Sequence, residues 1–280
     1  MKNFIKNQIN KLISILVEIF FKLNSGRFLL GALLNTIINR EVNIKHNNVT
    51  LTFTVPNSIN DFRIKTFSTK EPETLEWIDS IPFGSVVWDI GANIGLYTCY
   101  AAKSRECHVY AFEPSVFNLE LLARNISLNN LSDKVTIIPL PLSQSIQVSN
   151  LNMTTTEWGG AMSTFGKDFG QDGELLKKVF EFQTIGLSMV DALNMFKIPQ
   201  PDYIKMDVDG IEHLILKGGD EVLKAIDGLL IEINEDFHKQ SEDSKKFLQN
   251  AGLILSEKRH SEMFDNTIYK NSYNQIWHRP

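Results

Sequence analysis

Two carboxylates that follow apolar runs are the residues of this sequence best suited to binding a small molecule. The first run, residues 86–90, contains Asp89 and leads into a turn that begins at Gly91. The second, residues 108–112, ends at Glu113. Glycine permits positive φ and lets a ligand approach the backbone. A carboxylate at the carboxyl end of a strand in an open α/β sheet can bind both hydroxyls of a ribose. The pattern therefore predicts a nucleoside site with Glu113 on the ribose.

The glycine pattern narrows the kind of nucleoside. A dinucleotide-binding fingerprint reads G-x-G-x-x-G, whereas this turn has only Gly91 and Gly95. Asp89, just before the turn, would repel a phosphate but suits a ligand that carries an ammonium or sulfonium group, as S-adenosylmethionine does. An NAD-dependent oxidoreductase is therefore the disfavoured alternative.

The sequence Asp-Ile-Gly-Ala-Asn-Ile-Gly at 89–95, with Phe-Glu-Pro at 112–114, resembles the FkbM family of class I S-adenosylmethionine-dependent methyltransferases. The resemblance extends from about residue 61 to the C-terminus. It implies that S-adenosylmethionine is the cofactor and that Glu113 holds its ribose. The other residues expected at the cofactor are Asp89, Gly91, Ala92, Asn93 and Gly95 around the methionine part and Pro141, Leu142 and Ser143 along the adenine.

A second polar cluster, residues 202–213, lies at the end of another apolar run. It resembles the K-x-D-x-E/D-G-x-E signature of the same family, with Asp209 where Glu is commoner. Alternation along a strand places Lys205 inside the sheet, where an unpaired charge is costly. We therefore expect Lys205 to form an ion pair with Asp89 or Glu232.

Methyl transfer to an alcohol requires an aligned acceptor and a group that removes the hydroxyl proton. His213, with an ordinary pKa of about 6.5, and Asp207, at the carboxyl end of its strand, are the candidate catalytic bases; Asp207 is also a candidate cofactor contact. Asp209 is expected to bind the acceptor, although it and Glu212 also suit the start of the following helix. The oxygen ligands here would suit Mg²⁺ or Ca²⁺, but the EF-hand spacing is absent and no metal site is expected.

A long segment at about 143–183 interrupts the regular alternation of strands and helices. An irregular segment of this length in a compact domain is usually functional or disordered. The resemblance implies a small-residue loop beside the acceptor, so Trp158, Gly160 and Ser163 are expected to bind substrate as part of a lid. The alternative is an insertion without a functional role.

The apolar pattern predicts an α/β fold with a doubly wound, mostly parallel, Rossmann-like sheet, which the resemblance completes to the seven strands of class I methyltransferases. We expect a domain at 48–280 that begins with a small β-ribbon and a helix at 71–81. Strands are expected at 86–90, 109–112, 135–140, 203–207, 229–234, 253–258 and 273–277, helices at 115–129 and 244–250, and the two ribbon strands at 49–55 and 62–67.

Residues 1–47 are expected to form a separate helical extension. Apolar residues recur every three or four positions over 5–23 and again over 28–38, which predicts an amphipathic helical hairpin. Residues 1–45 carry a net charge of +5 within a chain of net charge −5. The hairpin is expected to pack on the catalytic domain, to mediate homodimerisation, or to contact an anionic membrane surface.

Composition limits the location and partners of the protein. The net charge of −5 gives no support to nucleic-acid binding. The pattern of the first residues favours neither a signal peptide nor a membrane span. The two cysteines, Cys99 and Cys107, form no disulfide framework, so a cytoplasmic protein is expected, with association with a membrane as the alternative left open.

The resemblance implies an O-methyltransferase that acts on a hydroxyl of a sugar, a glycan or another small polyhydroxylated metabolite. Within the same class, the alternative acceptors are a polyketide hydroxyl and an amide nitrogen. From another class, the alternative is a non-catalytic adaptor or membrane-attached assembly protein of a glycan pathway.

Overall fold

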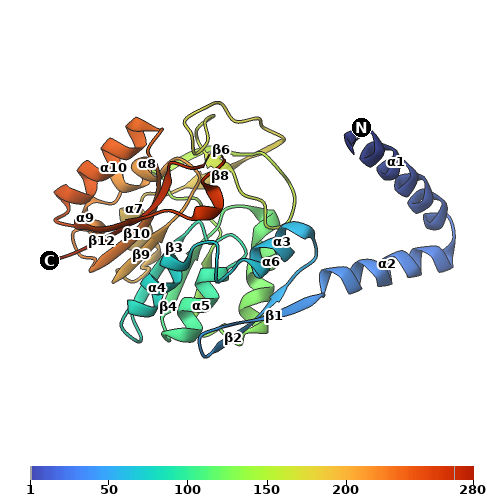
Figure 1. Cartoon of the computed structure of the whole chain (residues 1–280), viewed down its shortest axis with the longest axis horizontal. Coiled ribbons are helices and arrows are strands. Elements are labelled where there is room, and N and C mark those ends of the chain that lie inside the picture. Colours follow the sequence, from blue (N-terminus) through green and yellow to red (C-terminus); the bar gives the residue numbers. More distant parts are fainter. Residues whose placement is uncertain (1, 268) are drawn as a thin grey trace.

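The chain folds around a seven-stranded sheet of order β11-β12-β10-β9-β3-β4-β5 in a computed structural model that describes residues 2–267 and 269–280 (Figure 1). β12 (Ser272–His278) runs antiparallel to both of its neighbours, β10 and β11 (Ile254–Arg259). The parallel strands are β3 (Val86–Ile90), β4 (His108–Phe112), β5 (Val135–Ile138), β9 (Tyr203–Met206) and β10 (Gly228–Asn234). The predicted doubly wound, mostly parallel sheet is therefore confirmed.

Helices cover both faces of the sheet, so its central strands are mostly apolar, with Asp89 and Lys205 as buried exceptions. Tyr100 and Leu122 belong to the core on one face and Trp88 and Trp277 to the core on the other; all four side chains are buried. The first face is covered by α4 (Pro72–Ser80), α5 (Leu96–Ser104) and α6 (Val116–Leu128), and the second by α7 (Met189–Phe196), α8 (Glu212–Lys217), α9 (Asp220–Leu223) and α10 (His238–Asn250). This two-sided cover leaves the carboxyl ends of the parallel strands open along one edge.

The β-ribbon is present, but one of its predicted strands was wrong. β1 (Glu41–His46) pairs with β2 (Val49–Thr54) in an antiparallel ribbon. Residues 62–67, expected to be the second strand, instead include the end of helix α3 (Ser58–Lys65). The Asn57 side chain accepts a hydrogen bond of 2.9 Å from the backbone N–H of Asn60 and so caps this helix. The cap, together with burial of Asn60 and Ile64 on one helical face, outweighs the short alternation of apolar residues.

The segment at 143–183 is more regular than expected. β6 (Gln147–Met153) pairs antiparallel with both β7 (Ser163–Phe165) and β8 (Phe180–Gly186) in a separate three-stranded sheet. The connection between β6 and β7 contains the small residues Gly159, Gly160 and Ala161. The expectation of an irregular segment was therefore wrong for the residues that form these three strands. The connections between the strands are loops.

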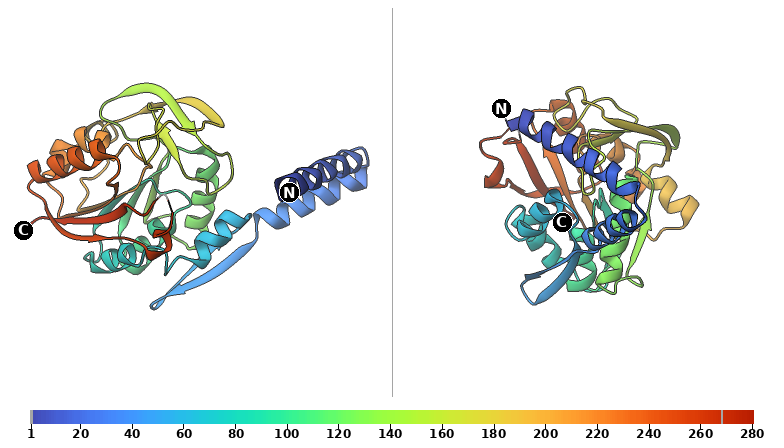
Figure 2. Two further views of the ribbon diagram at one scale, coloured as in Figure 1. Left: turned by 45° about the horizontal axis from the view of Figure 1, so that its top comes forward. Right: turned by 90° about the vertical axis from the view of Figure 1, so that its right-hand side faces the viewer.

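The first residues form the expected helical hairpin. α1 (Lys2–Phe21) and α2 (Asn24–Ile38) extend away from the rest of the chain (Figure 2). Gly26 makes the tight turn possible, because a Cβ at this position would lie 2.2 Å from the carbonyl oxygen of Phe20. Among the described residues, neither these helices nor any other are long and apolar enough to cross a membrane.

Candidate functional site

Three neighbouring cavities open at the carboxyl ends of β3, β4 and β9. Gly91, Asn93 and Asp207 line all three. Since β4 lies on one side of β3 and β9 on the other, the cavities meet where the strand order reverses, which is the usual ligand position in an open α/β sheet. The two polar clusters of the sequence are thereby brought together.

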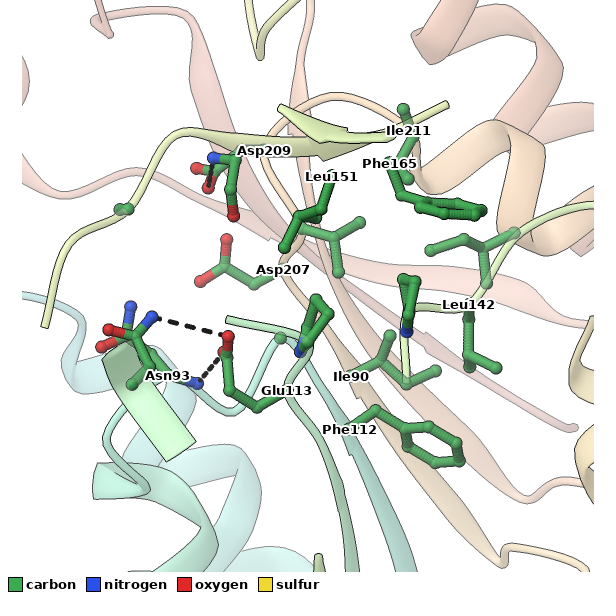
Figure 3. A pocket seen from close by; sticks show the side chains of 18 of the residues that line it. Ile90, Asn93, Phe112, Glu113, Leu142, Leu151, Phe165, Asp207, Asp209 and Ile211 are labelled. Carbon is green, nitrogen blue, oxygen red and sulfur yellow. Dashed lines mark hydrogen bonds between the residues drawn. The ribbon is translucent and has the colours of Figure 1, made fainter. Parts of the chain in front are cut away.

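The first cavity, called here the apolar cavity, has a free volume of about 540 Å³ including its open mouth (Figure 3). Glu113 and Asn118 contribute polar groups to its lining, together with Asp207 and Asp209. A cavity with apolar walls and a few polar groups suits a flat heterocycle joined to a hydroxylated ring. Its apolar lining comes from Ile90, Phe112, Leu140, Pro141, Leu142, Leu151, Phe165, Ile211 and Ile215.

Backbone N–H groups hold both oxygens of the Glu113 carboxylate. Its Oε2 accepts a hydrogen bond of 2.8 Å from the backbone N–H of Asn93, and its Oε1 accepts one of 2.8 Å from that of Ser115. Burial raises the pKa of this carboxyl to about 7, although these backbone donors and Asn118 lower it in part. The side chain is therefore fixed in position, and near neutral pH it exchanges between an acceptor and a donor of hydrogen bonds.

The glycine turn brings the backbone close to the second polar cluster. Gly91 has a φ of +87°, and a Cβ at this position would lie 1.9 Å from the carbonyl oxygen of Asp207. Asn93 also has a positive φ, and its side-chain Nδ2 donates a hydrogen bond of 2.9 Å to the carbonyl oxygen of Gly160. Only glycine fits at position 91, and Asn93 connects the turn to the segment between β6 and β7.

The second cavity, the lysine cavity, lies beside Lys70 and Lys205, with Arg63, Glu71 and Tyr97 also in its lining. The Tyr97 hydroxyl donates a hydrogen bond of 3.0 Å to Glu71, which also forms an ion pair with Lys70. The cavity therefore offers cationic groups beside the glycine turn.

Lys205 is 4% exposed and lies between two carboxylates. Its Nζ is 3.7 Å from Asp89 Oδ1 and 3.6 Å from Asp207 Oδ2, distances of ion pairs rather than hydrogen bonds. Burial lowers the pKa of Lys205, but the charges of Asp207 and Asp89 raise it by more, so its ammonium group stays charged. The expected pair with Asp89 is present. No ion pair with Glu232 is found among the described residues, and Asp207 takes that place.

The third cavity, the acidic cavity, has a free volume of about 690 Å³ including its mouth. Burial raises the pKa of Glu232 well above its usual range, and the negative charges of Asp207 and Glu71 raise it further. The pKa of Asp207 is lowered: burial opposes this, but the charges of Lys205 and Lys70 and a hydrogen bond from Glu232 exceed it. These shifts favour the protonated form of Glu232 beside the charged form of Asp207. The remaining lining includes Arg63, Lys70, Gln171, Phe264 and Tyr269.

Asp209 joins the second polar cluster to the segment between β6 and β7. Its Oδ2 accepts hydrogen bonds from the backbone N–H groups of Met162, at 2.7 Å, and Ser163, at 3.3 Å. Burial and the nearby charge of Asp207 raise the pKa of Asp209 to about 6. Both Asp209 and Met162 have positive φ. Such strained backbone persists where surrounding contacts fix it, and it is common at ligand sites.

Several of the residues expected at the site line these cavities. Ala92 borders the lysine cavity, Pro141, Gly160 and Ser163 border the apolar cavity, and Asp209 borders two. The backbone oxygen of Gly160 accepts hydrogen bonds from Asn93 and Asn118 rather than facing the cavity unpaired.

Other expected residues lie behind the cavity walls. Asp89 receives a hydrogen bond from Thr98 and an ion pair from Lys205 beneath the turn. A Cβ on Gly95 would lie 2.5 Å from Leu122, so this glycine permits close packing of α5 on α6. The Ser143 hydroxyl accepts a hydrogen bond of 2.8 Å from Gln147. The backbone oxygen of Trp158 accepts hydrogen bonds from Asn57 and Asn60.

His213 lies apart from the residues that line the three cavities. Its ring is 2% exposed, lies 5.6 Å from the Phe237 ring in an edge-on arrangement, and lines none of the three cavities. Burial lowers its pKa to about 4, so the imidazole is neutral. Glu212 is also turned inward, where it accepts hydrogen bonds of 3.1 Å from the backbone N–H groups of Val208 and Gly210.

Several polar residues of the site did not emerge from the sequence; besides Lys70, Glu71 and Tyr97 of the lysine cavity, they include Asn118, Arg63, Gln171 and Tyr269. Asn118 lies on α6, where its Oδ1 accepts a hydrogen bond of 3.0 Å from the backbone N–H of Gly159. Arg63 lies on α3 and donates a hydrogen bond of 3.0 Å to the Gly159 oxygen. Gln171 and Tyr269 come from loops. Asn118 could have been suspected as a polar residue one turn into a helix that follows Glu113. By contrast, Arg63, Gln171 and Tyr269 carry no local signal.

The donor set at the site suits organic ligands. Within residues 2–267 and 269–280, no group of three or more His, Cys, Asp or Glu side chains is arranged to hold a metal ion. By contrast, a fixed carboxylate beside apolar walls and a glycine turn open to the backbone are the features that a purine nucleoside requires.

Comparison with known sequences connects this geometry to a family. The profile described as "Methyltransferase FkbM domain" matches residues 89–262, and members of this family use S-adenosylmethionine. The matched range begins at Asp89 and includes both polar clusters and the segment between them.

Two curated relatives are similar over part of their length. The hexuronic acid methyltransferase AglP of Haloferax volcanii is 26% identical over 170 residues, which are 60% of this chain and 63% of the relative. The methyltransferase sdnD of Sordaria araneosa is 27% identical over 169 residues, which are 51% of this chain and 64% of the relative. The chain thus spans slightly less than two thirds of each.

Solved structures share the general arrangement only. TYW2 of M. jannaschii in complex with AdoMet has a TM-score of 0.43 and 18% identity, with 86% of this chain and 87% of that chain covered. The fibrillarin pre-rRNA processing protein of Methanococcus jannaschii has a TM-score of 0.46 and 12% identity, with coverage of 86% and 84%. Neither likeness bears on function.

Proposed function

The chain belongs to the FkbM family of methyltransferases, and from this premise we propose that it is an S-adenosylmethionine-dependent O-methyltransferase. Its proposed acceptor is a hydroxyl of a sugar, a glycan or another small polyhydroxylated metabolite. The observation that carries the proposal is the position of Asp207, which lines the apolar cavity and the acidic cavity at once. A cofactor in the apolar cavity and an acceptor in the acidic cavity would meet at this carboxylate.

The cofactor is proposed to lie across the apolar and lysine cavities. Glu113 would accept hydrogen bonds from the ribose hydroxyls, Phe112 and Leu142 would border the adenine, and the backbone of the turn at Gly91 would lie along the methionine part. When bound, S-adenosylmethionine supplies a methyl group activated by a positively charged sulfur. Arg63 and Lys70 line the lysine cavity, where their charges suit the carboxylate of the methionine part.

The chain's contribution to the reaction is proposed to be positioning and removal of one proton. Fixing two reactants in line can contribute about 7–11 kcal/mol to lowering the barrier. The pKa of Asp207 is lowered and that of Glu232 is raised, so the charged Asp207 carboxylate would accept the proton that the acceptor hydroxyl loses. The position of Asp207 favours it over His213, which lies outside the cavities.

The lining of the acidic cavity supports a polyhydroxylated acceptor. Gln171, Tyr269 and Arg63 offer hydrogen-bond donors, and Asp209 and Glu232 offer acceptors. A sugar presents several hydroxyls in a small volume and can use many of these groups at once. The similarity to a hexuronic acid methyltransferase supports a carbohydrate acceptor as well.

The site of action is proposed to be the cytoplasm. Cys99 and Cys107 are both free and buried. Burial raises the pKa of the Cys99 thiol to about 12, which keeps it protonated and unreactive. A reducing compartment suits a protein whose thiols stay unpaired.

An acceptor screen tests the proposed function. The full chain is incubated with S-adenosylmethionine labelled in its methyl group and with panels of sugars, uronic acids, polyketide alcohols and amides, and products are located by mass spectrometry. We expect a labelled methyl ether on a sugar hydroxyl. Asp207→Asn should lower the rate of its formation at least about tenfold, whereas Asp220→Asn, at an exposed position, should not. A methyl ester, an N-methyl amide, a methylated polyketide, or the absence of any product despite cofactor binding would contradict it.

A further inference from the structure

The helical arm, defined here as α1 and α2, is the part of the chain that the proposed function does not use. Sixteen of the thirty large apolar side chains that are exposed in the described residues lie on it or, in the case of Leu23, on the turn between its two helices. The left view in Figure 2 shows the arm projecting away from the catalytic domain. Soluble monomers rarely expose an apolar surface of this extent, so the arm requires a partner.

The shape of the apolar surface distinguishes between partners. At 3.6 residues per turn, the apolar positions of α1 cover about half of its circumference. A helix that pairs with another in a coiled coil needs a narrower stripe, whereas a helix that lies in a lipid interface uses a face of this width. The apolar face includes Ile5, Ile9, Leu12, Leu16 and Ile19, and the polar side includes Asn7, Asn10, Ser14 and Glu18.

Charge also favours a lipid surface over a second copy of the arm. Residues 1–45 contain seven basic and two acidic residues, whereas the rest of the chain carries −10. Two arms packed together would bring their positive charges close to each other. An anionic membrane would instead neutralise them.

The lysines lie where an interfacial helix needs them. Lys11 lies at one border of the apolar face of α1, and Lys22 follows directly after the last residue of this helix. Both are exposed. A lysine at such a border extends its aliphatic stem along the acyl boundary and its ammonium group toward lipid phosphates. α2 carries a further basic residue, Arg27, in its first turn. The two helices thus combine an apolar face that can insert into lipid with positive charges that attract anionic headgroups.

We propose that the arm binds the surface of an anionic lipid membrane, with the apolar face of α1 inserted at the level of the headgroups and the catalytic domain held beside the membrane. α1 is about 30 Å long and is not apolar enough to span, so it lies in the plane of the interface. The inference is independent of the proposed acceptor, because it rests on the arm alone.

Flotation of the full chain with vesicles tests this inference. Phosphatidylcholine vesicles with and without phosphatidylserine are compared for the native chain and for two double variants, Leu12→Gln with Leu16→Gln and Lys11→Glu with Lys22→Glu. The matched control is Leu175→Gln, which changes an equally apolar and more exposed side chain on the catalytic domain. Affinity for S-adenosylhomocysteine and the sedimentation coefficient are measured for every variant.

We expect the native chain to bind the anionic vesicles only. Either double variant should weaken this binding at least about tenfold, and Leu175→Gln should leave it unchanged. Equal binding to neutral vesicles would overturn the role of charge. A dimer that binds no vesicle and is dissociated by Leu12→Gln with Leu16→Gln would show that the arm pairs with a second copy. A monomer that binds neither vesicle would overturn the proposal outright. Unchanged affinity for S-adenosylhomocysteine shows that the variants fold.

Discussion

The carboxylate of Asp209 accepts a hydrogen bond of 2.7 Å from the backbone N–H of Met162, 47 residues earlier in the chain. This bond connects the loop after β9 with the segment between β6 and β7. Both residues have positive φ, so the contact holds two unfavourable backbone conformations together. Asp209 lines both the apolar and the acidic cavity, so the proposed acceptor site includes this junction.

Removal of the Asp209 acceptor is expected to loosen the segment. Asp209→Ala should accelerate amide exchange at Met162 and Ser163 by about 5- to 150-fold, which corresponds to about 1–3 kcal/mol for a lost hydrogen bond to a charged group. Asp209→Asn should have a smaller effect, because asparagine retains one acceptor and tolerates positive φ. Exchange measured by mass spectrometry checks this. Equal protection in all three proteins would mean that the bond contributes nothing to the order of the segment.

Glu113 is expected to carry much of the cofactor affinity. Glu113→Ala should weaken binding of S-adenosylhomocysteine by about 1–3 kcal/mol, since charge-assisted hydrogen bonds to the ribose are lost. Calorimetry measures this, with Glu120→Ala, a partly exposed glutamate on the following helix α6, as the control. An unchanged dissociation constant in Glu113→Ala would mean that the ribose lies elsewhere.

Cofactor affinity should depend on pH through the same carboxyl. Burial raises the pKa of Glu113 to about 7, and hydrogen bonds from ribose hydroxyls favour its charged form. The carboxyl is charged above pH 7 and protonated below it, so affinity should be highest above pH 7 and fall by up to about tenfold per pH unit below it. Glu113→Gln has no charge to lose and should show a flatter profile. Matching profiles for the two proteins would assign the dependence to other groups.

Gly91 and Gly84 form a matched pair for testing the close approach at the turn. Both have positive φ, but a Cβ on Gly84 meets nothing within 4 Å, whereas one on Gly91 would lie 1.9 Å from the Asp207 oxygen. Gly84→Ala should lower the free energy of unfolding by about 1–2 kcal/mol, the cost of the left-handed backbone alone. Gly91→Ala should lower it further and should reduce affinity for S-adenosylhomocysteine, because β3 and β9 must separate. Denaturant titration and calorimetry compare the two, and equal effects would contradict the steric account.

The cofactor side could be predicted from the sequence because its signals are local. The glycines at 91 and 95 and the acid at 113 lie within 25 residues and are placed by two adjacent strands. The pair between Lys205 and Asp89 was expected from alternation along the strand together with the strand order that the family resemblance implies. In each case, one strand end determines where the side chain lies.

The acceptor side could not be predicted in the same way, because it is assembled from distant loops. Tyr269 and Gln171 are about a hundred residues apart, and neither carries a pattern that marks a site. Arg63 was hidden by an alternation of apolar residues that suggested a strand, where the Asn57 cap starts a helix. His213 looked suitable by its residue type, but the first turn of α8 directs it to Phe237. Such contacts depend on tertiary packing and leave no trace in local spacing.

A crystal structure of the full chain with S-adenosylhomocysteine tests the central claim most directly. The account predicts ribose hydroxyls within hydrogen-bond distance of Glu113, the adenine between Phe112 and Leu142, and the sulfur facing the acidic cavity at Asp207. A nucleoside bound away from Glu113, or a sulfur that faces away from Asp207, would contradict it.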